Sequence, residues 1–255
     1  MRILTRLTLF IAAASFGLGW LPPSLTAAAS ESSAQSNHDP LEGMNRKIFW
    51  FNDKVDTYIF VPVATGWDAI APTRVKRCVS NFFQNLRFPI VTGNDVLQAK
   101  PLAAASDVGR FVVNTTVGVA GFFDPATGWG LEQHNEDFGQ TLGYWGVPPG
   151  PYLVLPFFGP SNPRDTVGLA ADSFSTVYPY FIAYVYTFSA NATNIINARA
   201  LGLKDVQQIK DASLDYYAAV RNWYEQRRAA LVHDRKGLSE EQQQDLYNVE
   251  TNDGE

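Results

Sequence analysis

Three polar residues recur at helical spacing inside an otherwise apolar segment, and they are the best candidates for chemistry in this chain. Asp107, Arg110 and Asn114 lie three and four positions apart between Pro101 and Gly121, so on a helix they form one polar stripe. One interpretation is a polar line that faces a water-filled or headgroup-filled passage. The other is a salt bridge and a cap within a helical core, and the spacing leaves both open.

The rest of the sequence contains no recognisable catalytic or metal-binding pattern. It has no G-x-S-x-G elbow, no P-loop and no G-x-G-x-x-G motif. Glu136 and Asp137 are adjacent acids, an arrangement more typical of an exposed first helical turn than of paired catalytic carboxylates. Cys78 is the only cysteine, and the three histidines (His38, His134, His233) lack H-x-x-x-H spacing. We therefore expect no enzyme activity, no metal site and no cofactor.

Composition and charge narrow the class of protein further. The chain has 255 residues, of which 46% are hydrophobic, so it can bury the core of one domain without disulfides. Its 20 basic residues stand against 25 acidic ones, which gives a net charge of -5. This balance argues against a surface built to neutralise phosphates, so nucleic acid is not an expected partner.

The first 38 residues resemble an export signal followed by a linker. Two arginines precede the apolar run Leu7–Leu21, and the small residues Ala27–Ala29 follow a pair of prolines, which predicts a signal peptide over residues 1–29. The run is shorter than the roughly 20 residues of a spanning helix, which disfavours the alternative of an uncleaved anchor. Residues 30–38 are polar and predict a flexible linker. No cysteine lies near the apolar run, so no lipobox is present and membrane attachment must come from the folded body.

Charged residues are missing from a long central region. Between Phe138 and Ala198 only Arg164, Asp165 and Asp172 are ionisable acids or bases. Two uncharged, aromatic-rich stretches, Phe138–Pro163 and Ser173–Ala198, result, and prolines prevent either from being a spanning helix. Aromatic residues with polar tips favour the lipid headgroup level. The stretches fit a protein lying in a membrane face and an uncharged soluble core equally well.

Periodicity predicts a mainly α protein of many short amphipathic helices with little or no sheet. Asp39 is placed to cap a helix with Pro40 at its first position, and apolar residues then recur every three or four positions. A similar pattern predicts a helix around Val75–Leu86, and Pro89 and Pro101 break the next part of the chain into short helices.

The C-terminal third predicts one long helix and an acidic end. Residues Lys204–Lys236 have an amphipathic pattern, so we expect a continuous helix there. The best strand signal is the short apolar run Tyr152–Phe158. Residues 237–255 are acidic and predict a disordered tail, which leaves 39–236 as the folded domain.

A series of short motifs is similar to the MlaA (VacJ) family. The motifs occur in order over roughly residues 39 to 230: D-P-L-E-G-M-N-R from Asp39, F-N-D-K-V-D from Phe51, S-N-F-F-Q-N-L from Ser80, N-D-V-L-Q from Asn94, E-D-F-G-Q-T-L-G-Y-W-G from Glu136, G-P-Y from Gly150 and G-P-S-N-P-R-D from Gly159. The chain departs from the family where it lacks the lipobox cysteine, and where Met44 and Ala99 replace the more common Phe and Gly.

The resemblance implies a fold, a location and a transport function. It implies a ring-like single domain on the periplasmic side of a Gram-negative outer membrane, with an amphipathic channel through which mislocalised phospholipids leave the outer leaflet. It further implies that they pass to a soluble periplasmic carrier and an inner-membrane ABC transporter complex, and that a trimeric porin is a partner. This would maintain the lipid asymmetry of the outer membrane.

The residues can be assigned roles within that expectation. We expect a polar lining from Asp107, Arg110 and Asn114, and an apolar wall or gate from Val112, Val119, Phe122 and Phe123. Structural roles as caps or buried ion pairs are expected for the family motif positions, which are Asp39, Pro40, Glu42, Gly43, Asn45, Arg46, Phe51, Asn52, Arg164 and Asp165. Two alternative functions stay open, a periplasmic lipid hydrolase and a soluble periplasmic scaffold.

Overall fold

The computed structural model describes residues 39–176 and 184–233, and its secondary structure is almost entirely helical. In chain order the elements are α2 (Glu42–Val55), η3 (Asp56–Phe60, a π-helical turn), α3 (Val61–Ile70), α4 (Thr73–Leu86), α5 (Phe88–Leu97), α6 (Pro101–Thr116), α7 (Pro125–Gly128), α8 (Phe138–Tyr144), β1 (Leu153–Leu155), β2 (Gly159–Ser161), α9 (Pro163–Ser175), α10 (Tyr184–Leu201), α11 (Leu203–Ala212) and α12 (Tyr216–Val232). The expected mainly α class is confirmed.

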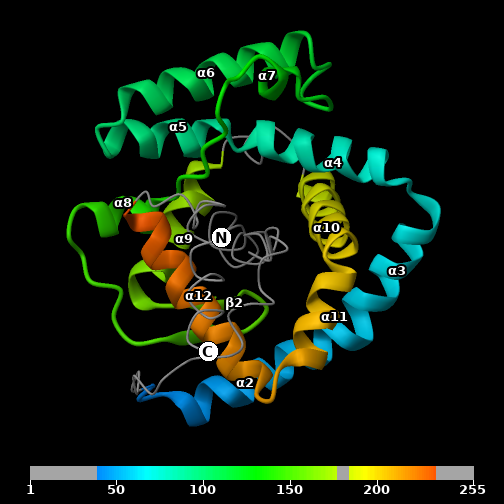
Figure 1. Cartoon of the computed structure of the whole chain (residues 1–255), viewed down its shortest axis with the longest axis vertical. Helices are drawn as coiled ribbons and strands as arrows, with labels where there is room; N and C mark the ends of the chain where they lie inside the picture. Colours follow the sequence, from blue (N-terminus) through cyan, green and yellow to red (C-terminus); the bar gives the residue numbers. More distant parts are fainter. Residues whose placement is uncertain (1–38, 177–183, 234–255) are drawn as a thin grey trace, which may run out of the picture.

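The helices follow one another around a ring (Figure 1). The ribbon runs from α2 through α3, α4 and α5, and α8, α9 and α12 complete the circle back to α2. Helix α10 packs against α3 and α4, and α8 packs against α9. Helices α6 and α7 lie on the outside of α5 (Figure 1), where α6 packs against α5. The ring-like arrangement implied by the family resemblance is therefore present.

Prolines and short polar side chains set many of the helix boundaries. Prolines occupy the first or second position of α3, α5, α6, α7 and α9, where the missing N–H has no helical partner to lose. Asp124, Asp137, Asn162 and Asp215 each accept a hydrogen bond from a backbone N–H in the first turn of the helix that follows. These signals explain why the chain forms many short helices.

A small hairpin and three aromatic or aliphatic side chains form a compact core beside α2 and α12. Strands β1 and β2 are antiparallel, with Val154 opposite Pro160. Tyr152, Val154 and Tyr217 are buried together, and Ile48 of α2 packs against them. The strand predicted at Tyr152–Phe158 is thus a three-residue strand and the turn after it.

Two of the predicted helix boundaries are wrong. The first helix begins at Glu42 rather than directly after Asp39, because Asp39 Oδ1 accepts the N–H of Leu41 in a turn that precedes the helix. The helix predicted over Lys204–Lys236 is two helices. It is interrupted because Ser213 has an extended backbone and its hydroxyl bonds back to the Ile209 carbonyl, while Asp215 caps a new helix.

Several predicted segments lie outside the described residues. These are the signal peptide at 1–29, the linker at 30–38, the acidic tail at 237–255, the last three residues of the predicted domain, and residues 177–183 of the second uncharged stretch.

Candidate functional site: an apolar exterior and a polar interior

The distribution of polar and apolar side chains is reversed relative to a typical soluble domain. Within the described residues, eighteen polar or charged residues are buried, compared with twelve apolar ones, five of which are alanine. The buried polar set is Asn45, Lys76, Asn94, Asp95, Gln98, Asp107, Arg110, Asn114, Glu136, Gln140, Thr141, Ser161, Asn162, Arg164, Asp165, Thr187, Asn197 and Arg199. Soluble domains bury such residues rarely. Polar contacts therefore have a larger share in this interior than in that of a typical soluble domain.

Large apolar side chains are exposed on almost every helix around the ring. The most exposed include Trp50, Tyr58, Ile70, Val96, Leu102, Trp129, Tyr186 and Leu214. Five of them belong to α2, η3, α3, α5 and α6, and the other three lie after α7, on α10 and between α11 and α12. An exterior with this much apolar surface is typical of a protein that contacts lipid or another protein.

Individual helices are amphipathic with the polar side facing in. In α4, Lys76 is buried and hydrogen bonded to Asp68, whereas its neighbour Val75 is 45% exposed. In α6, Asp107, Arg110 and Asn114 are each 7% exposed, whereas Val112 is 52% exposed. The polar stripe predicted from the sequence therefore exists, and its side chains point away from the apolar surface of α6.

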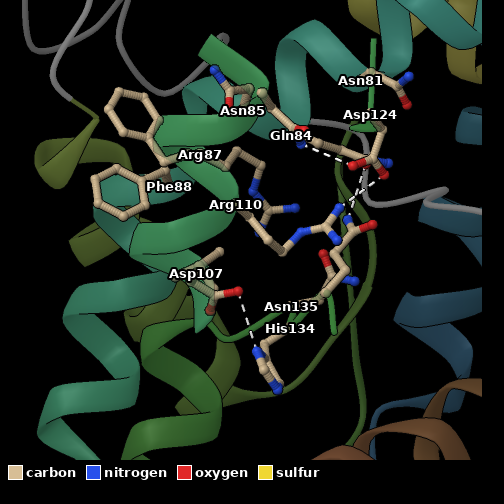
Figure 2. Close-up of a pocket in the computed structure, with 14 residues that line it drawn as sticks. Asn81, Gln84, Asn85, Arg87, Phe88, Asp107, Arg110, Asp124, His134 and Asn135 are labelled. Atoms are coloured by element: carbon tan, nitrogen blue, oxygen red, sulfur yellow. Dashed lines mark hydrogen bonds and ion pairs between the residues drawn. The ribbon is translucent and has the colours of Figure 1, made fainter. Parts of the chain in front are cut away.

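The polar stripe of α6 makes a dense network with the loop around α7 (Figure 2). Arg110 donates to Asp124 Oδ2 at 2.9 Å, to the Leu131 carbonyl at 2.6 Å and to Thr127 Oγ1 at 3.0 Å. Asn114 donates to Asp124 Oδ1 at 2.9 Å. Burial opposes ionisation of Asp124, but the hydrogen bonds from Thr127, Asn114 and Arg110 outweigh it and lower the pKa of Asp124. The salt bridge of the core interpretation is thus present.

The residues of this network also line a pocket, so they border open space as well as their hydrogen-bond partners. The pocket has a cavity volume of about 50 Å³ and is partly open to solvent. Figure 2 shows Arg110, Asp107 and His134 along one wall, with Asn85 and Gln84 of α4 nearby. Its lining combines these polar groups with Phe88, Val91 and Phe111. Charged, amide and aromatic side chains thus surround one small cavity.

The four residues expected to form an apolar wall lie on the exposed side of α6 and on the loop after it. Val119 and Phe123 are 60% and 57% exposed, and Phe122 stacks on Phe82 of α4 with ring centroids 4.9 Å apart. Val119 has a φ of 53°, a left-handed backbone that is rare for a β-branched residue. The close approach of the backbone at Gly118 requires glycine, because a Cβ there would lie 2.4 Å from two carbonyl oxygens.

A second buried polar cluster joins α8, α9 and α12. Arg228 donates to Asp137 at 2.6 Å and to Asp165 at 2.8 Å, and Asp165 also pairs with Arg164. Burial would raise the pKa of Asp137, but the hydrogen bonds from Arg228 dominate and hold this pKa at about 2. Nothing in the sequence pattern of α12 indicates this partner, since Arg228 lies 91 residues from Asp137.

The motif residues near the start of the chain attach α2 to the hairpin and to α12. Asn45 is fully buried, donates to the Tyr152 carbonyl and accepts the N–H of Val154, both at 2.9 Å. Asn52, two helical turns later, makes the same type of contact with Leu155 and Phe157. Arg46 pairs with Glu42 and, at 2.6 Å, with Asp215 at the start of α12.

The remaining motif residues have simpler surroundings. Asp39 accepts a hydrogen bond from Tyr217 Oη of α12. Phe51 packs on Phe157 with centroids 5.2 Å apart. Pro40 and Gly43 are respectively in the turn before α2 and exposed in its first turn.

A third carboxylate cluster was not anticipated from the sequence. Asp95 of α5 is fully buried beside Asp107 of α6 and near Glu136. Burial, together with the negative charge of Asp107, raises the pKa of Asp95 to about 8. His134 Nδ1 lies 3.2 Å from Asp107 Oδ1 (Figure 2). These residues are too far apart in the sequence for spacing to reveal their contact.

The described helices include no segment that is both long enough and apolar enough to cross a bilayer.

Comparisons with known proteins agree with the architecture. The family model described as MlaA lipoprotein matches residues 37–231. The chain is 38% identical over 211 residues to the intermembrane phospholipid transport system lipoprotein MlaA of Escherichia coli K12, covering 78% of this chain and 80% of that protein. It is 36% identical over 208 residues to an uncharacterized protein of Rickettsia prowazekii, covering 80% and 81%.

A solved structure extends the agreement to three dimensions. The structure, described as the structural basis for maintenance of bacterial outer membrane lipid asymmetry, superposes with a TM-score of 0.67 at 34% identity, and the match covers 76% of this chain and 98% of that one. On the family match, the sequence identity and the shared fold, this chain belongs to the MlaA family.

Proposed function

We propose that this protein is the outer-membrane component of an intermembrane phospholipid transport system. It removes mislocalised phospholipids from the outer leaflet through an amphipathic path and passes them towards the periplasm, which maintains the lipid asymmetry of the membrane. Its relatives in Escherichia coli and Haemophilus influenzae are named for intermembrane phospholipid transport, and its structural match concerns outer membrane lipid asymmetry.

The reversed burial of polar and apolar residues is the observation that carries this proposal. A phospholipid leaving a leaflet needs polar contacts for its headgroup and a path that shields its acyl chains from water. The described residues of the ring include many exposed apolar side chains and many buried polar ones. A ring lying in one leaflet would cover its exposed apolar side chains with lipid, and the polar groups that line the pocket beside α6 would be the nearest to a headgroup.

Membrane attachment in this proposal rests on the exposed apolar side chains. Trp50, Trp129 and Trp145 are each more than half exposed, and tryptophan favours the boundary between headgroups and acyl chains. The protein would lie on the periplasmic side of the outer membrane, embedded by its perimeter rather than by a spanning helix.

Within the ring, we infer that the α6 region contacts the lipid. Asp107, Arg110 and Asn114 would supply polar lining through the pocket of Figure 2. Val112, Val119, Phe122 and Phe123 would supply the apolar wall or gate on the exposed side of α6 and its loop. If Arg110→Ala folds normally and transfers lipid at the unchanged rate, the assignment of the polar lining is wrong.

The proposed transport route needs further components. A trimeric porin is the proposed neighbour in the outer membrane. A soluble periplasmic carrier and an inner-membrane ABC transporter complex are the proposed acceptors of the lipid. Co-purification from membranes after crosslinking tests the porin, and lipid transfer to a purified carrier tests the route.

The decisive experiment measures phospholipid at the cell surface with an impermeant amine-reactive label. Labelling should rise in a strain lacking the gene and return to normal with a plasmid-borne copy. Unchanged labelling would contradict the proposal. Release of fatty acid or lysophospholipid by the pure protein would instead support a lipid hydrolase, and recovery without detergent in the soluble fraction would support a periplasmic scaffold.

A further inference from the structure

Three side chains from distant parts of the sequence bring metal-binding atoms together beside α5 and α6. Asp95 lies on α5, Asp107 on α6, and His134 in the segment that precedes α8. One ligand atom from each lies within 4.8 Å of the other two. Ligands bound to a zinc ion at about 2.0–2.2 Å are at most about 4.4 Å apart, so small side-chain adjustments would close the site.

Asp95 indicates that this cluster lacks a positive partner. The residue is 0% exposed, and no hydrogen-bond donor reaches either of its carboxylate oxygens. Asp107 Oδ2 is buried without a donor as well. An ionised carboxylate in such surroundings is strongly unfavourable unless a cation or a proton compensates it.

When all three carboxylates are ionised, the charges around the cluster leave an excess of two negative charges. Asp95, Asp107 and Glu136 are acidic, and the nearby base is Lys100, which pairs with Glu136 at 3.2 Å. Gln98 donates to the other oxygen of Glu136 at 2.8 Å, so that carboxylate is already satisfied. Arg110, one turn after Asp107, pairs with Asp124 instead. With a neutral His134, a divalent cation would balance the cluster.

We propose that Asp95, Asp107 and His134 bind a divalent first-row transition-metal ion, with zinc as the probe. An imidazole nitrogen beside two carboxylates suits zinc or manganese better than magnesium or calcium, which prefer all-oxygen sites. Asp107 and His134 line the pocket shown in Figure 2, which gives the ion a route from solvent. The ion would join α5, α6 and the segment before α8.

The bound ion would have a structural role. His134 belongs to the connection between α7 and α8, which has no regular secondary structure from Leu131 to Asp137. Coordination would fix this connection to the α5–α6 pair. The competing explanation is a proton shared between Asp95 and Asp107, and it needs no metal at all.

The test titrates zinc chloride into the full chain, purified in detergent and stripped with a chelator. We expect one zinc per chain by calorimetry, with a dissociation constant of micromolar or below, and a rise of a few degrees in the unfolding temperature at saturation. Asp95→Asn and His134→Gln should each weaken binding at least tenfold. His233→Gln changes the exposed histidine that follows α12 and should leave binding unchanged.

Three results would overturn the inference. The first is that the unmodified chain binds no zinc at this affinity. The second is that both variants bind zinc as the unmodified chain does, which would locate zinc elsewhere. The third is that Asp95→Asn is as stable as the unmodified chain and zinc raises the unfolding temperature of neither, which would favour the shared proton. His134 is partly exposed, so its variant tests the site even if Asp95→Asn does not fold.

Discussion

Ion pairs in this molecule differ in burial, and therefore in what they contribute to stability. Arg228 is mostly buried and bridges Asp137 and Asp165, whereas Arg46 pairs with Asp215 where both side chains are 43% exposed. Removing one partner of a buried pair leaves an uncompensated charge, while exposed pairs are weakened by water and salt. The same chemical contact thus has two different energetic roles.

Substitution of the two arginines should separate these roles. Arg228→Met should lower the free energy of unfolding by about 3–5 kcal/mol, because it leaves Asp137 and Asp165 without their shared cation. Arg46→Met, the matched control, should cost at most about 1 kcal/mol. Urea unfolding in detergent, followed by circular dichroism, measures both. Equal losses would show that the α8–α9–α12 cluster is open to solvent.

The Asp137 carboxylate should make stability depend on pH in acid. Its pKa is held at about 2, below the ordinary value of 3.8, so it stabilises the folded state above pH 4 and this contribution is lost as the pH falls towards 2. The contribution above pH 4 is about 2 kcal/mol. Unfolding free energies at pH 5, 4 and 3 measure the decline.

Asn at position 137 provides the comparison, because it keeps the helix cap without the charge. Asp137→Asn should show a shallower decline than the unmodified chain, while Asp211→Asn, on an exposed part of α11, should decline like the unmodified chain. If the unfolding free energy of all three proteins declines equally with pH, Asp137 is not the source of the pH dependence.

At the scale of elements, one position shows a backbone conformation that does not suit its residue. Ala99 follows α5 with a φ of 56°, the left-handed region that glycine adopts at little cost. Helices commonly end in this way with a glycine at the same place. The sequence comparison with the family singled out this alanine in the position of a more common glycine, and the structure supplies the physical reason for that preference.

Ala99→Gly should therefore stabilise the protein. Relief of the left-handed conformation is worth about 1–2 kcal/mol, and the greater freedom of glycine in the unfolded chain offsets part of it, which leaves a gain of about 0.5–1 kcal/mol. Ala105→Gly, at an exposed position within α6, should instead cost about 1 kcal/mol. Thermal unfolding measures whether each variant is more or less stable than the unmodified chain. A lower stability of both variants would contradict the prediction for Ala99→Gly.

The sequence predicted the presence of helices better than it predicted where they end or which side chains contact one another. Apolar spacing and prolines located α4, α5 and α6, because these are local signals. The break between α11 and α12 escaped because the pattern continues across it while Ser213 turns its hydroxyl back to α11. The stripe on α6 was visible from spacing, but its partner Asp124 and the contact between Asp95 and His134 depend on tertiary packing.

At the scale of the molecule, the exposed apolar side chains are the feature on which the proposed membrane location depends. The sequence showed a shortage of charge but could not separate a membrane-facing surface from a soluble core, because both are uncharged. The structure shows exposed aromatic side chains within both uncharged stretches, among them Trp145 at 53% and Tyr186 at 70% exposure. The ring itself was expected from family resemblance rather than from periodicity, which contains no information about closure.

A charge on the exterior should weaken membrane binding without unfolding the protein. Ile70→Lys places a lysine at an exposed apolar position at the end of α3, and vesicle binding should fall about tenfold because the charge opposes transfer into lipid. Gln207→Lys adds the same charge at an exposed polar position of α11 and should bind as before. Flotation with phospholipid vesicles measures both, and equal binding would place Ile70 outside the lipid.

The contacts that attach α2 to α12 also govern the order of events during folding. Arg46 and Asp215 are separated by 169 residues, and Asp39 and Tyr217 by 178. Such contacts close a long loop, which costs conformational entropy, so they form late in folding. The contacts between α2 and α12 therefore wait until α12 exists, whereas α2 can already contact the hairpin through Asn45 and Asn52. Refolding should be slow for a helical protein, and a chaperone would have its longest opportunity to bind before this last contact forms.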